Sequence, residues 1–211
     1  MEKPDLSGAY ALNGAEDCRH LYADWAETYD QDFAATMAYR LPAEVATAFL
    51  KSNPPKGAVL DVGAGTGLLA AALRGMGFDD PIDGVDLSAE MLERAGRKGD
   101  YRSLIVADIT RPLPMETRYA GIVSSGTFTH GHVGPEGLDA LLEVALPGAR
   151  VVLSVNQAVW DGKGFAASFD AFGTKISELS LDAVAIYGEA AKTTDPTHAD
   201  DRALLVSFQI S

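Results

Sequence analysis

Short apolar runs alternate with segments of helical period along the middle of the chain. The runs are rich in β-branched residues, which favour strands, and they occupy residues 58–62, 82–85, 103–107, 120–124 and 151–155. Between them, apolar side chains recur at helical spacing in segments that begin near Thr66, Ser88 and Gly134. Strands in alternation with helices predict a parallel sheet that is covered by helices on both faces.

The last part of the chain follows a different pattern. Apolar side chains that step by four and three residues along a predicted helix are Phe165, Phe169, Phe172, Ile176 and Leu179. Two apolar runs follow at residues 183–187 and 203–210, and apolar and polar positions alternate in the second run. These two runs predict an antiparallel β-hairpin at the end of the chain.

Residues 1–55 lie outside the alternation, and their pattern predicts helices, the second of which begins near Pro42. We therefore expect an α/β fold with a seven-stranded, mostly parallel sheet, a C-terminal antiparallel hairpin and an N-terminal helical cover. We expect one domain over residues 1–211. It would comprise the cover at 1–55, a core at 56–155 that binds the ligand, and the C-terminal helix and hairpin at 156–211.

Composition and charge restrict the partners and the compartment. The 211 residues include 30 acidic and 17 basic side chains, for a net charge of -13. Such a charge repels a phosphate backbone, so nucleic acid is not an expected partner. A single cysteine, Cys18, fits a reducing cytoplasm. The chain shows neither a signal-peptide pattern nor a run of about 18 apolar residues, so we expect a cytoplasmic protein without a membrane partner.

The strongest chemical signal is an apolar run that leads into three glycines, Gly63, Gly65 and Gly67, and then into a helix. Glycine permits close approach of the backbone to a ligand, and the helix N-terminus offers unpaired N–H groups. Leu68 stands where a dinucleotide fingerprint requires Gly or Ala. The chain also lacks the G-x-x-x-x-G-K-[ST] motif of phosphate-loop hydrolases.

The acid-x-G-x-G-x-G motif that starts at Asp61 resembles the first motif of class I S-adenosylmethionine-dependent methyltransferases. The resemblance spans about residues 56–155. A narrower resemblance, carried by residues 21–30 and 126–134, is to a methyltransferase-like group that includes the Williams-Beuren-region methyltransferase-like protein. The resemblance implies a Rossmann-like fold, S-adenosylmethionine as the cofactor, and methyl transfer to a small-molecule nucleophile.

The resemblance also implies cofactor contacts where the strands end. Asp86 would accept hydrogen bonds from both ribose hydroxyls, which suits the two oxygens of a carboxylate. Asp108 would lie near the adenine amino group, and Leu87 and Met91 would flank the adenine ring, although Met91 equally suits core packing. The expected cofactor-binding residues are Asp61, Gly63, Ala64, Gly65, Gly67, Asp86, Leu87, Met91, Asp108, Ile109 and Ser124.

Two histidines follow the fourth predicted strand, within the glycine-rich segment 126–134. His132, and with less support His130, is a candidate general base, because the ordinary pKa of histidine lies near 6.5. A loop or capping role is the alternative for each. No cysteine or nearby acid completes a metal site with this pair, so no metal is expected.

Further residues are candidates for lining or covering the acceptor. Arg40 could pair with the methionine carboxylate of the cofactor. The expected substrate or lid residues are Tyr22, Trp25, Tyr29, Arg40 and Phe128, with ordinary packing as the alternative for the aromatic ones.

Two other functions remain open at this point. One is aminopropyl transfer on the same fold, and the other is a catalytically silent module that only binds S-adenosylmethionine. The fourth predicted strand is followed by Ser124-Ser125-Gly126-Thr127 and not by [ND]-P-P-[YF], which disfavours methylation of amides or base amino groups. The sequence does not assign the acceptor, the methylated atom or the oligomeric state.

Overall fold

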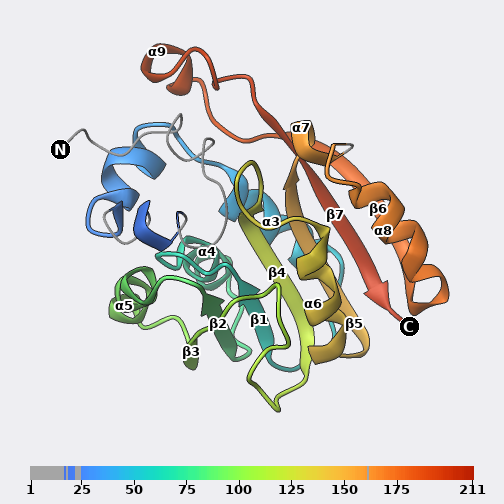
Figure 1. Ribbon diagram of the computed structural model, residues 1–211. Coiled ribbons are helices and arrows are strands. Elements are labelled where there is room, and N and C mark those ends of the chain that lie inside the picture. Colours follow the sequence, from blue (N-terminus) through green and yellow to red (C-terminus); the bar gives the residue numbers. More distant parts are fainter. Residues whose placement is uncertain (1–16, 18, 22–24, 161) are drawn as a thin grey trace.

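The alternating apolar runs form one seven-stranded sheet in the computed structural model, which describes residues 17, 19–21, 25–160 and 162–211 (Figure 1). The strands follow the order β3-β2-β1-β4-β5-β7-β6 across the sheet. The first five strands are parallel, and β7 lies antiparallel between β5 and β6. The strands are β1 Val59–Val62, β2 Ile82–Asp86, β3 Ser103–Val106, β4 Tyr119–Phe128, β5 Ala145–Asn156, β6 Ile176–Ala185 and β7 Arg202–Ile210.

Helices cover both faces of this sheet (Figure 1). The α-helices are α3 Leu41–Lys51, α4 Leu68–Gly75, α5 Ala89–Lys98, α6 Leu138–Val144, α7 Gln157–Trp160, α8 Phe165–Phe172 and α9 Ala191–Thr194. A π-helical turn, Tyr29–Ala35, precedes α3, and 3-10 turns occupy Pro135–Gly137 and Gly173–Lys175. This arrangement is the predicted fold class.

Alternate residues of each central strand enter two different cores, because side chains two positions apart share one face. Leu60 and Val62 pack with α6 and α8, whereas Val59 packs with α3 and α4. All four residues of β1 are buried. Burial on both faces explains why the strand appears in the sequence as an apolar run that only Asp61 interrupts.

The C-terminal part corrects two details of the sequence-based prediction. The predicted helix stripe continues to Leu179, but α8 ends at Phe172 and Gly173 takes a positive φ of 52°. Ile176 and Leu179 belong to β6, where Ile176 pairs with Ile210 of β7. The first hairpin strand therefore covers Ile176–Ala185 and not 183–187. The helix that was predicted from the spacing of apolar residues by three and four was wrong after Phe172, because pairing with β7 determines the conformation of this segment.

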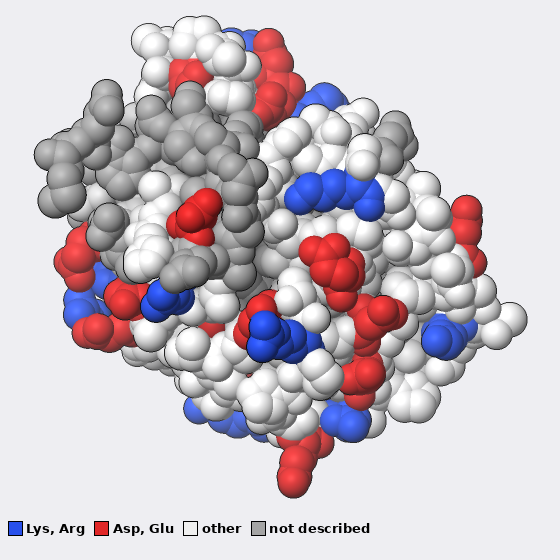
Figure 2. Space-filling view, in the orientation of Figure 1, with Lys and Arg blue, Asp and Glu red and all other residues white. Residues whose placement is uncertain are grey.

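The described part of the N-terminal cover packs on the carboxyl end of the sheet through a third apolar core. Trp25, Phe33 and Leu41 meet Ile186 and Tyr187, which follow β6. No helix in the described residues is long and apolar enough to cross a membrane. Lys and Arg side chains are interspersed with Asp and Glu over the face shown in Figure 2.

Candidate functional site

The glycine-rich loop after β1 depends on backbone conformations that other residues rarely adopt. Gly63, Gly65 and Gly67 have positive φ values of 68°, 54° and 87°. A Cβ atom on Gly63 would lie 2.0 Å from the Oγ1 atom of Thr127. The loop therefore needs glycine both for its conformation and for its close packing against the segment after β4.

Asp86 ends β2 and holds the loop in place. One carboxylate oxygen accepts the backbone N–H of Gly65 at 2.8 Å, and the other accepts that of Ser88 at 2.9 Å. Burial raises the pKa of Asp86, and hydrogen bonds from backbone N–H groups oppose that shift. Each oxygen retains acceptor capacity for a ligand hydroxyl, because a carboxylate oxygen has two lone pairs.

Asp61 lies behind the loop and not at its surface. Its Oδ2 atom accepts a 2.6 Å hydrogen bond from the hydroxyl of Tyr101, and its buried Oδ1 atom has no hydrogen-bond partner among the described residues. Burial raises the pKa of Asp61 to about 7, the Tyr101 hydrogen bond opposes the shift, and the charge of Asp86 adds to it. Asp61 thus supports the loop through Tyr101.

A cavity of about 350 Å³ opens over the carboxyl ends of β1, β2 and β4. Most of the expected cofactor-binding residues line it, together with two residues expected on the acceptor side. These lining residues are Gly63, Ala64, Gly65, Asp86, Leu87, Met91, Asp108, Ile109, Tyr29 and His132. Asp61, Gly67 and Ser124 do not line it; Ser124 is fully buried and donates a hydrogen bond to the carbonyl of Val62 at 2.7 Å.

His132 borders the cavity on the loop that follows β4. The Nδ1 atom of its ring lies 2.6 Å from the carbonyl oxygen of His130. A carbonyl oxygen only accepts, so Nδ1 carries the proton, and Nε2 is the basic nitrogen of the neutral ring. Burial lowers the pKa of His132, and the charge of Lys163 acts in the same direction. His132 is therefore a neutral imidazole at neutral pH.

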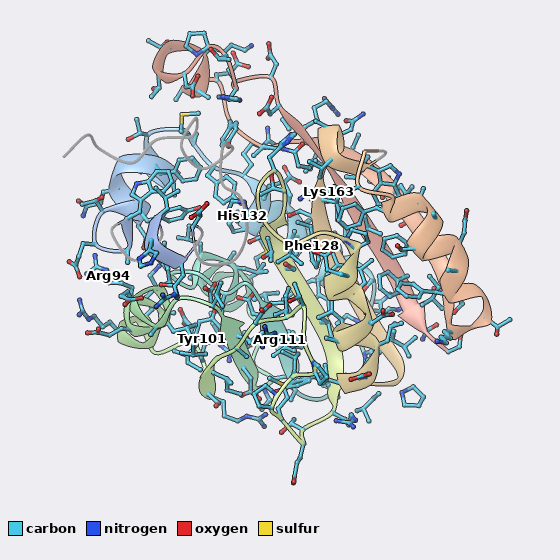
Figure 3. All side chains as sticks on the ribbon, viewed as in Figure 1. Arg94, Tyr101, Arg111, Phe128, His132 and Lys163 are labelled. Carbon is cyan, nitrogen blue, oxygen red and sulfur yellow. The ribbon has the colours of Figure 1, made fainter. Side chains whose placement is uncertain are left out.

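Lys163 holds the backbone of the same loop. Its ammonium group donates to the carbonyl oxygens of Thr129 at 3.2 Å and of His132 at 3.3 Å. Figure 3 shows Lys163, His132 and Phe128 grouped near the end of β4. His130 contributes its carbonyl oxygen to this arrangement and does not line the cavity.

A smaller hollow of about 50 Å³, here called the side pocket, adjoins the cavity. The two spaces share Tyr29, Tyr39, Gly126 and His132 as walls. The residues that line the side pocket are Trp25, Tyr29, Phe33, Tyr39, Leu41, Gly126, Phe128, Thr129, His132, Ser154, Asn156, Ile186 and Tyr187. Trp25 and Phe128 therefore belong to this pocket, and they also pack in the apolar cores.

One of the expected substrate or lid residues, Arg40, lines neither space in the structure. Arg40 pairs with Glu44 at 2.6 Å, one helical turn away, and half of its side chain is exposed. Tyr22 lies outside the described residues.

Several lining residues were missed by the sequence-based prediction. They are Arg19, Tyr39, Thr66, Thr127, Glu136, Ser154 and Asn156. Ser154 and Asn156 were detectable, because they are polar positions in the last part of a strand, residues 151–156, whose other members are Val and Leu. Arg19 and Tyr39 carry no such signal, because they precede the sheet in the chain and reach the cavity through packing alone.

The chain is similar to known methyltransferases in its sequence. Residues 33–191 match the methyltransferase domain family. The chain is 38% identical over 142 residues to methyltransferase-like protein 27 of Homo sapiens, which covers 65% of this chain and 57% of that protein. It is 37% identical over 107 residues to a malonyl-[acyl-carrier protein] O-methyltransferase of Priestia megaterium, which covers 49% of this chain and 38% of that protein. The matches thus span only part of both relatives.

Solved structures share the fold. The structure of a DhpI–SAH complex has a TM-score of 0.63 and 21% sequence identity, and the match covers 93% of this chain and 97% of that one.

The residues described above suit S-adenosylmethionine. The remaining acceptor capacity of Asp86 matches a vicinal diol, and the glycine loop leaves room for a ligand against its backbone. This chain belongs to the methyltransferase domain family, as a class I methyltransferase with a Rossmann-like fold and S-adenosylmethionine as its cofactor.

Proposed function

We propose that this chain transfers the methyl group of S-adenosylmethionine to an oxygen, nitrogen, sulfur or carbon nucleophile of a small molecule. The proposal depends mainly on one observation: a single cavity extends from Asp86, past the glycine loop, to His132. S-adenosylmethionine supplies a methyl group that is already activated on a sulfonium. The protein therefore has to align the two reactants, exclude water and, for some acceptors, remove a proton.

In this proposal the strand ends hold the cofactor. Asp86 accepts the two ribose hydroxyls, and Asp108 and the backbone of Ile109 meet the adenine ring, which Leu87 and Met91 flank. All five residues line the cavity, which supports these roles. The backbone of the glycine loop approaches the remainder of the cofactor. Asp61 and Ser124 act from behind, by holding Tyr101 and the end of β1.

His132 positions or deprotonates the acceptor in the same proposal. Its lowered pKa keeps the ring neutral at neutral pH, and Nδ1–H is engaged by the carbonyl of His130, so Nε2 is the nitrogen that takes the proton. His130 is the less supported candidate, because its side chain does not line the cavity. A thiol acceptor, with its low pKa, would need little help from a base.

The other two functions receive less support. Aminopropyl transfer would need acidic groups for a polyamine, and none of the described residues that line the side pocket is acidic. A silent binding module would not need a neutral histidine held in one tautomer beside the cavity.

The test combines binding and transfer. Calorimetric titration should show binding of S-adenosylmethionine and S-adenosylhomocysteine but not of NAD. Incubation of a small-metabolite extract with methyl-labelled cofactor should then yield a labelled low-molecular-weight product, which boiled protein does not form. Binding without a labelled product would favour the silent module. A second incubation, with decarboxylated S-adenosylmethionine labelled in its aminopropyl group, would favour the aminopropyl transferase if it alone gave a labelled product.

A further inference from the structure

Two polar side chains near the end of β5 line the side pocket. Ser154 and Asn156 lie two positions apart on the strand, so they share one face with Val152, which packs in the core under α3. Only 1% of Ser154 and 6% of Asn156 is exposed. Both line the side pocket and neither lines the larger cavity. Polar groups this buried are normally hydrogen-bonded, so their partners indicate what the pocket can hold.

The amide of Asn156 is oriented by one hydrogen bond. Its Oδ1 atom accepts the backbone N–H of Ala158 at 2.9 Å, and an N–H donor can only bind the oxygen side of the amide. The NH₂ group therefore points away from Ala158, and among the described residues no acceptor bonds to it. Asn156 thus brings two unused donor hydrogens to the wall of the side pocket.

Ser154 adds a third donor. Its Oγ atom accepts the backbone N–H of Gly126 at 2.8 Å, which leaves the hydroxyl hydrogen without an acceptor in the part of the chain that the structure describes. The same bond fixes Gly126, a wall that the side pocket shares with the larger cavity. The donors therefore lie where the side pocket adjoins the cofactor cavity.

The other walls of the side pocket are mainly apolar. They are formed by aromatic rings and by Leu41 and Ile186, and among the described lining residues none is acidic. Lys163 adds positive charge at the loop that carries Thr129 and His132. Donors and a nearby cation in an apolar pocket favour an oxygen with lone pairs and disfavour an ammonium group. The volume of about 50 Å³ corresponds to roughly three to five water-sized positions. It suits a head group of a few atoms.

We propose that Ser154 and Asn156 bind the methyl acceptor through a hydrogen-bond-accepting oxygen. The acceptor is then a small compound that carries a hydroxyl or carboxylate oxygen on an apolar body, and an amine is not the group that enters the side pocket. The inference rests on the proposed function, because it treats the side pocket as the acceptor end of the cofactor cavity.

The test uses the whole chain saturated with S-adenosylhomocysteine and three probes of similar size, phenol, benzoate and benzylamine. Binding of each is measured by saturation-transfer NMR and titration. The informative variant is Asn156→Asp, because its carboxylate still accepts the N–H of Ala158 but replaces the two donor hydrogens by an acceptor. Asn53→Asp makes the same change at an exposed position outside both spaces and is the matched control.

We expect phenol or benzoate, but not benzylamine, to bind the wild-type complex. Asn156→Asp should weaken the binding of the oxygen probe by about tenfold or more and strengthen the binding of benzylamine. Asn53→Asp should change neither affinity. Binding of phenol but not of benzoate would assign a hydroxyl head group to the acceptor. Binding of benzoate but not of phenol would assign a carboxylate. Tighter binding of benzylamine than of both oxygen probes to wild type, no binding of either oxygen probe, or no effect of Asn156→Asp would each overturn the inference.

The affinity for S-adenosylhomocysteine separates this inference from the proposed function. Asn156 does not line the cofactor cavity, so its substitution should leave that affinity within about threefold of wild type. Failure of the wild-type chain to bind S-adenosylhomocysteine would contradict the proposed function. Normal binding of S-adenosylhomocysteine with the wrong probe preference would contradict only the assignment of the side pocket.

Discussion

The hydroxyl of Thr66 in the glycine loop donates a 2.5 Å hydrogen bond to the carboxylate of Asp30, which lies 36 residues earlier in the chain. The second oxygen of Asp30 accepts a 2.6 Å hydrogen bond from the ammonium group of Lys98 on α5. Arg94, on the same helix and labelled in Figure 3, donates to the backbone of Glu27 at 2.6 Å. The N-terminal cover is therefore attached to both the loop and the helix that flank the cofactor cavity.

Thr66→Val should loosen this attachment, because it removes the hydroxyl donor while the side-chain volume stays nearly the same. We expect a loss of about 1.5–3 kcal/mol in the free energy of unfolding, the usual range for a hydrogen bond to a charged group. Dissociation of S-adenosylhomocysteine should also become faster. Denaturant titration and stopped-flow measurements check both effects. Thr47→Val on α3, a threonine that lines neither space, is the control. Equal behaviour of the two variants would contradict the prediction.

Asp86→Ala should weaken S-adenosylmethionine binding by roughly 10- to 100-fold. Two ribose hydroxyls would lose a charged acceptor, and water would replace part of the interaction. The loop would also lose the acceptor for the N–H of Gly65. Calorimetry on the folded variant measures the effect, with Asp79→Ala as an exposed control. Unchanged affinity would mean that Asp86 acts only on the backbone.

His132→Ala should lower turnover by at least about 10²-fold for an acceptor that needs a base, and leave cofactor affinity within about threefold. His198→Ala serves as the matched control, because His198 pairs with Asp201 and lines neither space. Full activity of His132→Ala would leave alignment and exclusion of water as the mechanism.

Lys163→Met tests the protonation state of the same histidine. The cation lowers the pKa of His132, so its removal should raise that pKa. Because the base acts when unprotonated, turnover falls as pH drops through its pKa, and the acidic limb of the pH–rate profile should move to higher pH in Lys163→Met. A limb that stays in place, with wild-type cofactor affinity, would mean that another group titrates.

Asp61 should make the folded chain less stable as pH rises toward neutrality. Its pKa is raised from 3.8 to about 7, so between these values the folded state retains a proton that the unfolded chain has released. The free energy of unfolding then falls across this window, by roughly 4 kcal/mol at most. Asp61→Asn keeps an acceptor for Tyr101 and does not titrate, so it should flatten the dependence. Urea unfolding at about pH 5 and about pH 8 measures this dependence, with Asp79→Asn as the control. If the free energy of unfolding changes with pH equally in both variants, Asp61 is not the cause.

The order of strands and helices, and the glycine loop with Asp86 at the next strand end, could be predicted from the sequence. These features are local: burial on both faces makes a parallel strand an apolar run, and positive φ values require glycine at fixed spacing. Because carboxyl ends of parallel strands share one edge of the sheet, the sequence also predicted that Asp86 and Asp108 lie at that edge, and both line the cavity there.

The distant residues that complete that site are set by tertiary packing. The fold brings Tyr101 to Asp61 across 40 residues and puts Ser154 and Asn156 in one pocket with His132. It also places Ile176 and Leu179, whose spacing predicts a helix, in a strand that pairs with β7. These contacts depend on how segments far apart in the chain pack against each other, and the local period of apolar and polar residues carries no information on that packing.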